Sequence, residues 1–436
     1  MMARANTDTA IKPYDLFILD HKSFKNVEME CTRALRKYVE LIAYDRPHNS
    51  IPFFFIITVG ILEFVNNCMV ILTERENKEK FLMGIKDLFM ISAAFSIIME
   101  TSFNSQKAHK LLDLIEMECL VSRYRFVGLG QKFAKIEERY NEKKAAMERM
   151  YNNIFYVVVV VYFGAINRHL LSSLFEGSSE LGKTRDWPTP FVYWCPAGYN
   201  TFTFFLFMYT FQSLMLLLCT ISGGSVEIIV FLATEKVLAD FETIVLLLDK
   251  ITTEFPDFDF GEASGSPQTK QMNTLLTMNE ELKRDMSIIV QCHQALNRNF
   301  KDCAEIPAFG ILMNTFIISL DTIFNVYLML KAQDLITSIN YAAASFFINL
   351  IGFFRFHTGH GIVDQNDVFR QSVANLPWTN KPAWFKQMLI IMMGRANIDT
   401  EIKPYNIFVL NHKTFKNIMT SVFTYANFFY TRHSMS

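Results

Sequence analysis

Long runs of apolar residues recur along the chain, separated by polar segments. A helix needs about 20 mostly apolar residues to cross a bilayer, and seven runs come close to this length. The pattern therefore predicts an all-α polytopic membrane protein with seven transmembrane helices. The predicted spans are residues 51–73, 82–101, 154–175, 201–222, 306–330, 337–356 and 405–430.

The last predicted span differs from the others because polar residues interrupt it. Such groups are costly where they face lipid. At helical spacing they fall on one stripe, and apolar residues fall on another. This pattern is typical of a helix that lines a pore, and equally of a polar helix packed within a bundle. The polar stripe holds Asn417, Thr420, Thr424, Asn427 and Thr431; the apolar stripe holds Ile418, Val422, Tyr425 and Phe429.

The segments between the spans also carry helical patterns. Residues 31–44 are amphipathic and basic, which predicts a helix at the membrane interface. Apolar residues at helical spacing predict further helices over 226–251 and 272–303, and the loop 256–268 between them is rich in Gly, Ser, Pro and Asp. Such helices project from the bilayer, and we expect them to pack on one another or on other subunits.

Lys and Arg residues favour one side of the predicted membrane. Residues 1–50 and the connecting segments on the same side hold 8, 10, 7 and 5 of them, whereas the alternate segments hold 3, 2, 1 and 1. Positive charge is enriched in cytoplasmic segments, so the N-terminus and the long helical extensions are expected in the cytoplasm. The expected location is the cell membrane, crossed several times.

Composition narrows the function classes. The chain has 436 residues, of which 51% are hydrophobic and 42 are Phe, too apolar for one soluble domain. Its formal net charge of −1 lacks the excess of positive charge expected of a protein that binds nucleic acid. The sequence has no phosphate-binding glycine loop, zinc-type Cys and His cluster or nucleophile elbow. We therefore expect no enzyme activity, cofactor or metal site, and we expect the seven scattered cysteines to remain thiols.

The N-terminus repeats a segment from near the C-terminus. Residues 1–27 match residues 392–418 at a constant offset, and 18 of the 27 positions are identical. A structural repeat would recur as a whole packing unit, whereas this copy breaks off before the apolar half of the last span. We therefore favour a chimeric start over a functional N-terminal domain. Residues 1–28, the copy of 392–419, are expected to be dispensable, and 29–436 form the seven-helix domain.

Several ionisable residues lie inside the predicted spans. A charged group within the membrane marks a candidate functional site, but those near the ends of spans can extend to the interface. Glu63 is more central, and we expect it to face Lys86 as one half of an ion pair. The full set is Glu63, Lys86, Asp87, Arg168, His169 and Asp321.

The C-terminal third contains a series of motifs: residues 293–300, residues 357–378, and Trp378, Phe385, Lys386, Leu389, Met393, Arg395, Thr414, Phe415, Thr424 and Tyr425. In these motifs the chain resembles the insect odorant receptors, and the resemblance extends from about residue 29 to the end of the chain. Seven spans, a cytoplasmic N-terminus and a very short outer tail are the arrangement of that family, which is opposite to that of the G-protein-coupled receptors.

The resemblance implies an odorant-gated, non-selective cation channel of olfactory sensory neurons. This chain would be its ligand-tuned subunit, which binds a small volatile odorant and assembles with the shared co-receptor as a heterotetramer in the lipid bilayer. In that family the last helix lines the pore, which assigns Thr424, Phe428 and Thr431 to the conduction path with Tyr425 packed behind. Phe428 and Arg432 lie near positions where the co-receptor has smaller aliphatic residues. This difference fits a tuning subunit better than a channel that works alone.

The same resemblance places odorants in the outer half of each subunit. Binding of a volatile ligand must come mainly from apolar burial, at about 25 cal/mol per Å², shaped by aromatic walls and a hydroxyl. We expect Tyr209 and Tyr341 to supply hydroxyls. For any single residue, ordinary aromatic packing between helices explains the pattern as well. The predicted pocket comprises Phe89, Met90, Tyr162, Ile166, Phe205, Met208, Tyr209, Phe324, Tyr341 and Phe346.

Two other functions compete with this interpretation. A gustatory-type chemoreceptor channel of the same superfamily would usually end in a Thr-Tyr pattern followed by Gln-Phe, and the stretch from Thr424 to Thr431 lacks the Gln-Phe. A secondary transporter would carry inverted repeats and broken helices near the midplane. The only repeat in the sequence is the terminal copy, which is not half of a bundle.

Overall fold

Helices make up almost all of the structure. The computed structural model describes residues 30–42, 50–103, 105–117, 119–121, 136–149, 151–153, 156, 189–196, 201–254, 269–332, 335–379, 381–398 and 400–435. These residues contain no strand, which confirms the all-α prediction. The labelled helices are α2 (Glu30–Ile42), α3 (Ile51–Thr73), α4 (Lys78–Phe103), α5 (Ser105–Glu116), α7 (Phe202–Glu254), α8 (Thr269–Glu305), α9 (Ala308–Lys331), α10 (Leu335–Ala374), α11 (Ala383–Ala396) and α12 (His412–Met435).

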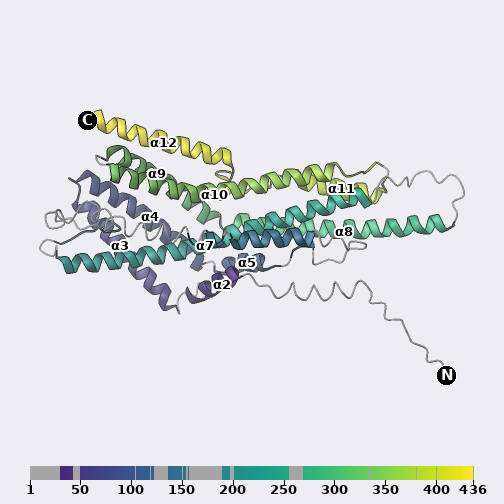
Figure 1. Cartoon of the computed structure of the whole chain (residues 1–436), viewed down its shortest axis with the longest axis horizontal. Helices are drawn as coiled ribbons and strands as arrows, with labels where there is room; N and C mark the ends of the chain where they lie inside the picture. Colours follow the sequence, from purple (N-terminus) through teal and green to yellow (C-terminus); the bar gives the residue numbers. More distant parts are fainter. Residues whose placement is uncertain are drawn as a thin grey trace, which may run out of the picture.

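The helices form two regions (Figure 1). One, which we call the bundle, contains α3, α4, α9, α12 and the first parts of α7 and α10. The other, the extension, contains the remainder of α7 and α10 with α8 and α11. The two longest helices, α7 and α10, pass from one region into the other, so the two regions share continuous backbone.

The apolar runs correspond to helices of the bundle. Among the described residues, four helices are long and apolar enough to cross a membrane, and they match predicted spans one, two, five and six. Predicted span four is the start of α7, whose apolar helical part is shorter, Phe202–Leu218. Predicted span three, 154–175, lies almost entirely outside the described residues, as do residues 1–28. The count of seven spans stays a prediction.

Two predicted helix boundaries are wrong. The span 201–222 and the helix 226–251 are predicted as separate elements, whereas both belong to the single 53-residue helix α7. The last span was expected to start at residue 405, but Tyr405 and Asn406 have positive φ angles of 49° and 58°, which end any helix there. The helix starts at residue 412, where the side chain of Asn411 accepts a 2.8 Å hydrogen bond from the N–H of Thr414.

Apolar side chains are distributed differently in the two regions. The extension buries a large core in which Phe241, Phe369 and Phe385 are at most 1% exposed. The bundle instead presents large apolar side chains on its surface, such as Phe207 and Phe346, each 62% exposed. A surface of this kind is stable against lipid and costly in water. The bundle is therefore the region suited to the bilayer.

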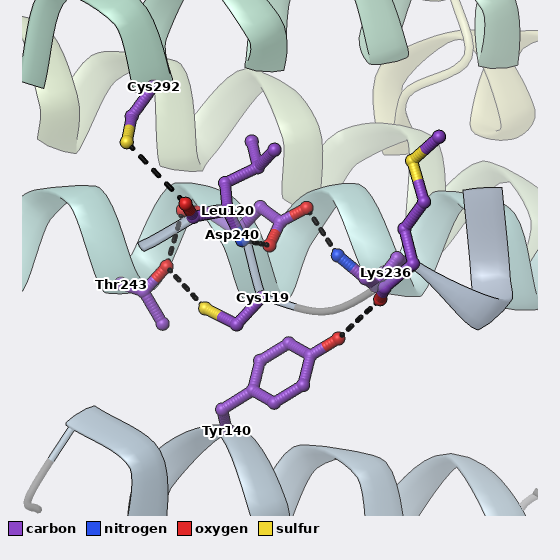
Figure 2. A network of polar contacts seen from close by, with 8 residues as sticks. Cys119, Leu120, Tyr140, Lys236, Asp240, Thr243 and Cys292 are labelled. Atoms are coloured by element: carbon purple, nitrogen blue, oxygen red, sulfur yellow. Dashed lines mark hydrogen bonds and ion pairs between the residues drawn. The ribbon is translucent and has the colours of Figure 1, made fainter. Parts of the chain in front are cut away.

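A buried ion pair organises the extension (Figure 2). The Nζ of Lys236 lies 2.5 Å from Oδ2 of Asp240, one turn further along α7, and both residues are at most 1% exposed. The other carboxylate oxygen of Asp240 accepts a 3.2 Å hydrogen bond from the N–H of Leu120. Lys236 also lies 5.3 Å from the ring centre of Tyr140, whose segment, 136–149, is helical. The pair thus joins two other chain segments to α7.

The protonation states around this pair follow from burial and charge. Burial disfavours the charge of Lys236, but Asp240 and the neighbouring groups outweigh it and raise the pKa of Lys236 above its ordinary value. Burial also raises the pKa of Tyr140 above its ordinary value and that of Cys119 to about 11. At neutral pH, Lys236 is charged while the phenol and the thiol are neutral. Asp240 is therefore the partner that balances the lysine.

Removing the partner should destabilise the fold strongly. In the variant Asp240→Ala, the charge of Lys236 stays buried without its carboxylate, which costs about 3–5 kcal/mol. The matched control is Glu305→Ala, which breaks the exposed pair with Lys301 at the same i, i+4 spacing and should cost under about 1 kcal/mol. Unfolding of the purified chain in detergent measures both. Equal effects in the two variants would contradict the role of the buried pair.

Candidate functional site

A buried polar centre lies where α3 and α7 meet in the bundle. Glu63 on α3 is fully buried, and one of its carboxylate oxygens, Oε1, accepts hydrogen bonds from three amide groups. The donors are Asn66 and Gln212, both at 3.2 Å, and Asn67 at 3.3 Å. Gln212 lies on α7 and is also fully buried. The amides thus hold one side of the carboxylate in a fixed position between the two helices.

The segment 189–196 is attached to this centre through its backbone. The N–H of Phe191 donates to Gln212 at 3.1 Å, and the N–H of Trp194 donates to Asn66 at 2.9 Å. The N–H of Val192 donates to Asp87 of α4 at 3.2 Å. Side chains of three helices therefore hold this segment over the polar centre.

The predicted ion pair between Glu63 and Lys86 is wrong. The Nζ of Lys86 lies 3.4 Å from Asp321 and donates to Asn325 at 3.0 Å, and both partners are on α9. Glu63 instead points toward Gln212 of α7. The rotation of α3 and α4 about their axes decides which partner each charge meets, and the hydrophobic pattern does not specify that rotation.

The predicted pocket residues have different environments. Tyr341 is buried and packs with Tyr327 and Leu328 of α9. On α7, the ring centres of Phe205 and Tyr209 are 5.9 Å apart. Met208 is buried, Met90 and Phe324 are half-buried, Phe89 and Phe346 are exposed, and Tyr162 and Ile166 lie outside the described residues. The pocket as a whole therefore stays a prediction, with Tyr341 and Met208 its most enclosed members.

Sequence reasoning missed Asn66, Asn67 and Gln212 as members of a site. Each is an uncharged polar residue within an otherwise apolar run. Such residues inside predicted spans need partners because lipid offers none. That signal was present in the sequence, although it does not tell which residues pair.

The last helix, α12, lies at the edge of the bundle (Figure 1). Its buried side chains, Val422 and Ala426, face the bundle. The predicted pore residues Thr424 and Phe428 lie on the opposite, open face, where Phe428 is 55% exposed. Tyr425 is exposed to a similar extent, and Thr431 is half-buried. The polar stripe of this helix is thus turned away from the helices of its own chain.

The start of α12 is fixed against α10 by a close contact. A Cβ atom placed on Gly359 of α10 would come within 2.5 Å of Cβ and 2.7 Å of the carbonyl oxygen of Leu410. Nearby, Nδ1 of His357 lies 3.2 Å from Nε2 of His412, and the rings of Phe356 and Phe415 are 5.4 Å apart between centres. The close packing of α10 against the start of α12, which we call the joint, depends on a glycine at position 359, because any side chain there would collide with Leu410.

Comparisons with known proteins agree with this architecture. The family model described as 7tm Odorant receptor matches residues 90–423. Two solved structures are similar: the insect olfactory receptor OR5 from Machilis hrabei, and the same receptor in complex with eugenol. Both are 13% identical to this chain and cover 86% of it; the coverage of the receptor chain is 88% and 87%, and the TM-scores are 0.63 and 0.64. No curated protein matches the chain by sequence.

The joint between α10 and α12 provides a direct test. Gly359→Ala should lower the midpoint of thermal unfolding in detergent, because the added methyl group collides with Leu410; overpacking of this kind costs about 1–3 kcal/mol. Gly361→Ala is the matched control, since its Cβ would meet Leu238 at 3.5 Å, an ordinary contact. The control should leave the midpoint unchanged or raise it slightly. A harmless Gly359→Ala variant would show that the joint tolerates a side chain.

Proposed function

The chain belongs to the 7tm odorant receptor family, and on this basis we propose that it is the ligand-tuned subunit of an odorant-gated, non-selective cation channel. The family is one of receptors and not of enzymes. The match to this family favours an odorant receptor over a gustatory receptor or a secondary transporter. The channel role is supported by one observation above all, which is the open polar face of α12.

The open face of α12 needs an environment that a single chain in lipid does not supply. Its exposed side chains include Asn417, Thr420 and Thr424, whose hydroxyl and amide groups are costly in hydrocarbon. The hydroxyl of Thr424 donates back to the carbonyl of Thr420, which reduces this cost without removing it. Water in a conduction path between subunits would form hydrogen bonds with the hydroxyl and amide groups of this face. A subunit arrangement with α12 facing the pore therefore accounts for the polar stripe.

The proposed assembly is a heterotetramer with the shared co-receptor in the cell membrane of olfactory sensory neurons. The Lys and Arg distribution supports a cytoplasmic N-terminus and a cytoplasmic location of the extension. The ligand is a small volatile odorant bound within the bundle. Olfactory receptor OR5 from Machilis hrabei has been solved in complex with eugenol, which supports a ligand of this size for the present chain.

The pore assignment is tested by changing Phe428. Phe428→Ala or Phe428→Glu should alter ion permeability ratios or block in the channel assembled with the co-receptor, because the side chain faces the proposed path. Phe429→Ala is the matched control: Phe429 is similarly exposed, at 50% against 55%, but belongs to the apolar stripe and lies about 140° of arc from Thr424. If both Phe428 variants conduct as the parent does at normal surface expression, Phe428 does not line the pore.

The ligand site is tested at Tyr341 and Tyr209. Either residue changed to Ala should shift the odorant dose–response or the ranking of ligands. Ile166→Trp, which adds a large side chain, should fill the predicted pocket and change the response as well. Tyr341→Phe removes only the hydroxyl and should shift the response by up to about tenfold, the value of one hydrogen bond. Ile339→Ala, on the exposed side of α10, should leave the tuning unchanged. Unaltered tuning in all the pocket variants would place the ligand elsewhere.

A further inference from the structure

Two imidazole rings from different helices face each other at the joint between α10 and α12. Nδ1 of His357, on α10, lies 3.2 Å from Nε2 of His412, the first residue of α12. The two residues are 55 positions apart, so no short sequence motif reveals the pair. His357 is exposed, His412 is half-buried, and the contact between them is at the surface.

The separation of the two nitrogens fits a shared metal ion. Zn²⁺ binds imidazole nitrogens at about 2.0–2.1 Å in tetrahedral geometry, which places two such nitrogens about 3.3 Å apart. A hydrogen bond, in which one ring donates its N–H to the other, would give a similar separation. Both nitrogens can bind a metal when each neutral ring carries its proton on the other nitrogen. The ring positions therefore allow a metal bridge without movement of either helix.

Neighbouring residues hold the two rings in this arrangement. The ring of Phe353 stacks on both imidazoles, with its centre 5.9 Å from that of His357 and 5.5 Å from that of His412. The backbones are held as well, because Gly359 of α10 packs closely against Leu410, just before α12 begins. Ligands that are fixed before an ion arrives bind it more tightly. Both the rings and the helices that carry them are thus prepared for an ion.

A third histidine and a carboxylate lie next to the pair. The ring centre of His360 is 4.5 Å from that of His412, and Nδ1 of His360 is buried without a hydrogen-bond partner among the described residues. Nε2 of His360 lies 3.8 Å from Oδ2 of Asp364, which brings a negative charge close to the imidazoles and favours a cation there. The opposing charges on α12, Lys413 and Lys416, are exposed, where solvent and salt screen them.

The chemistry of the pair selects the kind of ion. Imidazole nitrogen is a suitable ligand for Zn²⁺, Cu²⁺ and Ni²⁺, whereas Mg²⁺ and Ca²⁺ prefer oxygen. The described part of the chain contains no group of three or more His, Cys, Asp or Glu side chains arranged to hold a metal ion. An ion at the pair therefore takes two ligands from the chain and the others from water.

We propose that His357 and His412 bind a divalent transition-metal ion, for which Zn²⁺ is the probe, and that the ion bridges α10 to α12. The bridge adds a bond across the joint to the contact between Gly359 and Leu410. Because α12 is the helix assigned to the pore, a bound ion restricts the movement of that helix relative to α10. Binding of the ion does not depend on the proposed function, and it is measured without recording current.

The binding is tested on the full chain purified in detergent. The midpoint of thermal unfolding is measured at increasing concentrations of ZnCl₂, because an ion that binds only the folded chain raises this midpoint as its concentration rises. Zn²⁺ should raise the midpoint, and EDTA should reverse the rise. MgCl₂ at the same concentrations should leave the midpoint unchanged, since Mg²⁺ prefers oxygen ligands.

Two variants connect the effect of Zn²⁺ to the pair. His357→Ala and His412→Ala should each raise the Zn²⁺ concentration that gives half of the rise by at least about tenfold, because loss of a residue that merely supports a ligand already costs about 10–100-fold in affinity. His109→Ala, which removes a half-buried imidazole from α5, is the matched control and should leave that concentration unchanged. Because His357 is exposed, its variant decides the question if His412→Ala does not fold.

The proposal is overturned if Zn²⁺ raises the midpoint no more than Mg²⁺ does, or if either variant keeps the response of the parent chain. The first result would leave the rings joined by a hydrogen bond alone, and the second would assign Zn²⁺ to other residues. Failure of the channel hypothesis is distinguishable from both. A chain that responds to Zn²⁺ as expected but gives no odorant-evoked current with the co-receptor would support the site and contradict the channel, and a conducting chain without the Zn²⁺ response would do the reverse.

Discussion

The bilayer supplies no hydrogen bonds, so each polar group within it must find a partner in protein or water. In the bundle most such groups pair with one another: Lys86 lies 3.4 Å from Asp321, and Asn349 donates to Thr322 at 2.9 Å. Some polar atoms of the described residues depart from this rule: Oε2 of Glu63, Oδ1 of Asn67 and Oδ1 of Asn349 are buried without a partner there. The open face of α12 departs from it too, and its polar groups need water or other subunits.

Two continuous helices, α7 and α10, connect the bundle with the extension. α10 carries Tyr341 at its bundle end and Phe369 in the core of the extension, and Gly359 between them contacts the start of α12. α7 carries Gln212 beside Glu63 and, further along, Lys236 and Asp240 in the extension. The ion pair connects α7 to the segments that carry Leu120 and Tyr140. The close contact of Gly359 with Leu410 connects α10 to the start of the last helix.

The sequence was sufficient for the helices that a simple apolar run encodes. The spans at α3 and α9 were predicted to within a few residues, because length and apolarity decide them. The start of α12 was not, since it depends on the left-handed backbone of Tyr405 and Asn406 and on the cap by Asn411. Pairings such as Glu63 with Gln212 arise from helix rotation and packing between distant segments, which a one-dimensional pattern does not contain. For the same reason the predicted pocket includes both buried residues such as Tyr341 and exposed ones such as Phe346.

In the proposed channel, this chain supplies both the ligand tuning and a wall of the pore. Whole-cell recording from cells that express the chain alone, the co-receptor alone, or both tests this division of roles. Rapid odorant-evoked cation currents are expected only when both are present, with a ligand ranking that changes when residues of the bundle of this chain are changed. Currents with the same ligand ranking from the co-receptor alone, or responses that require G-protein signalling, would contradict it.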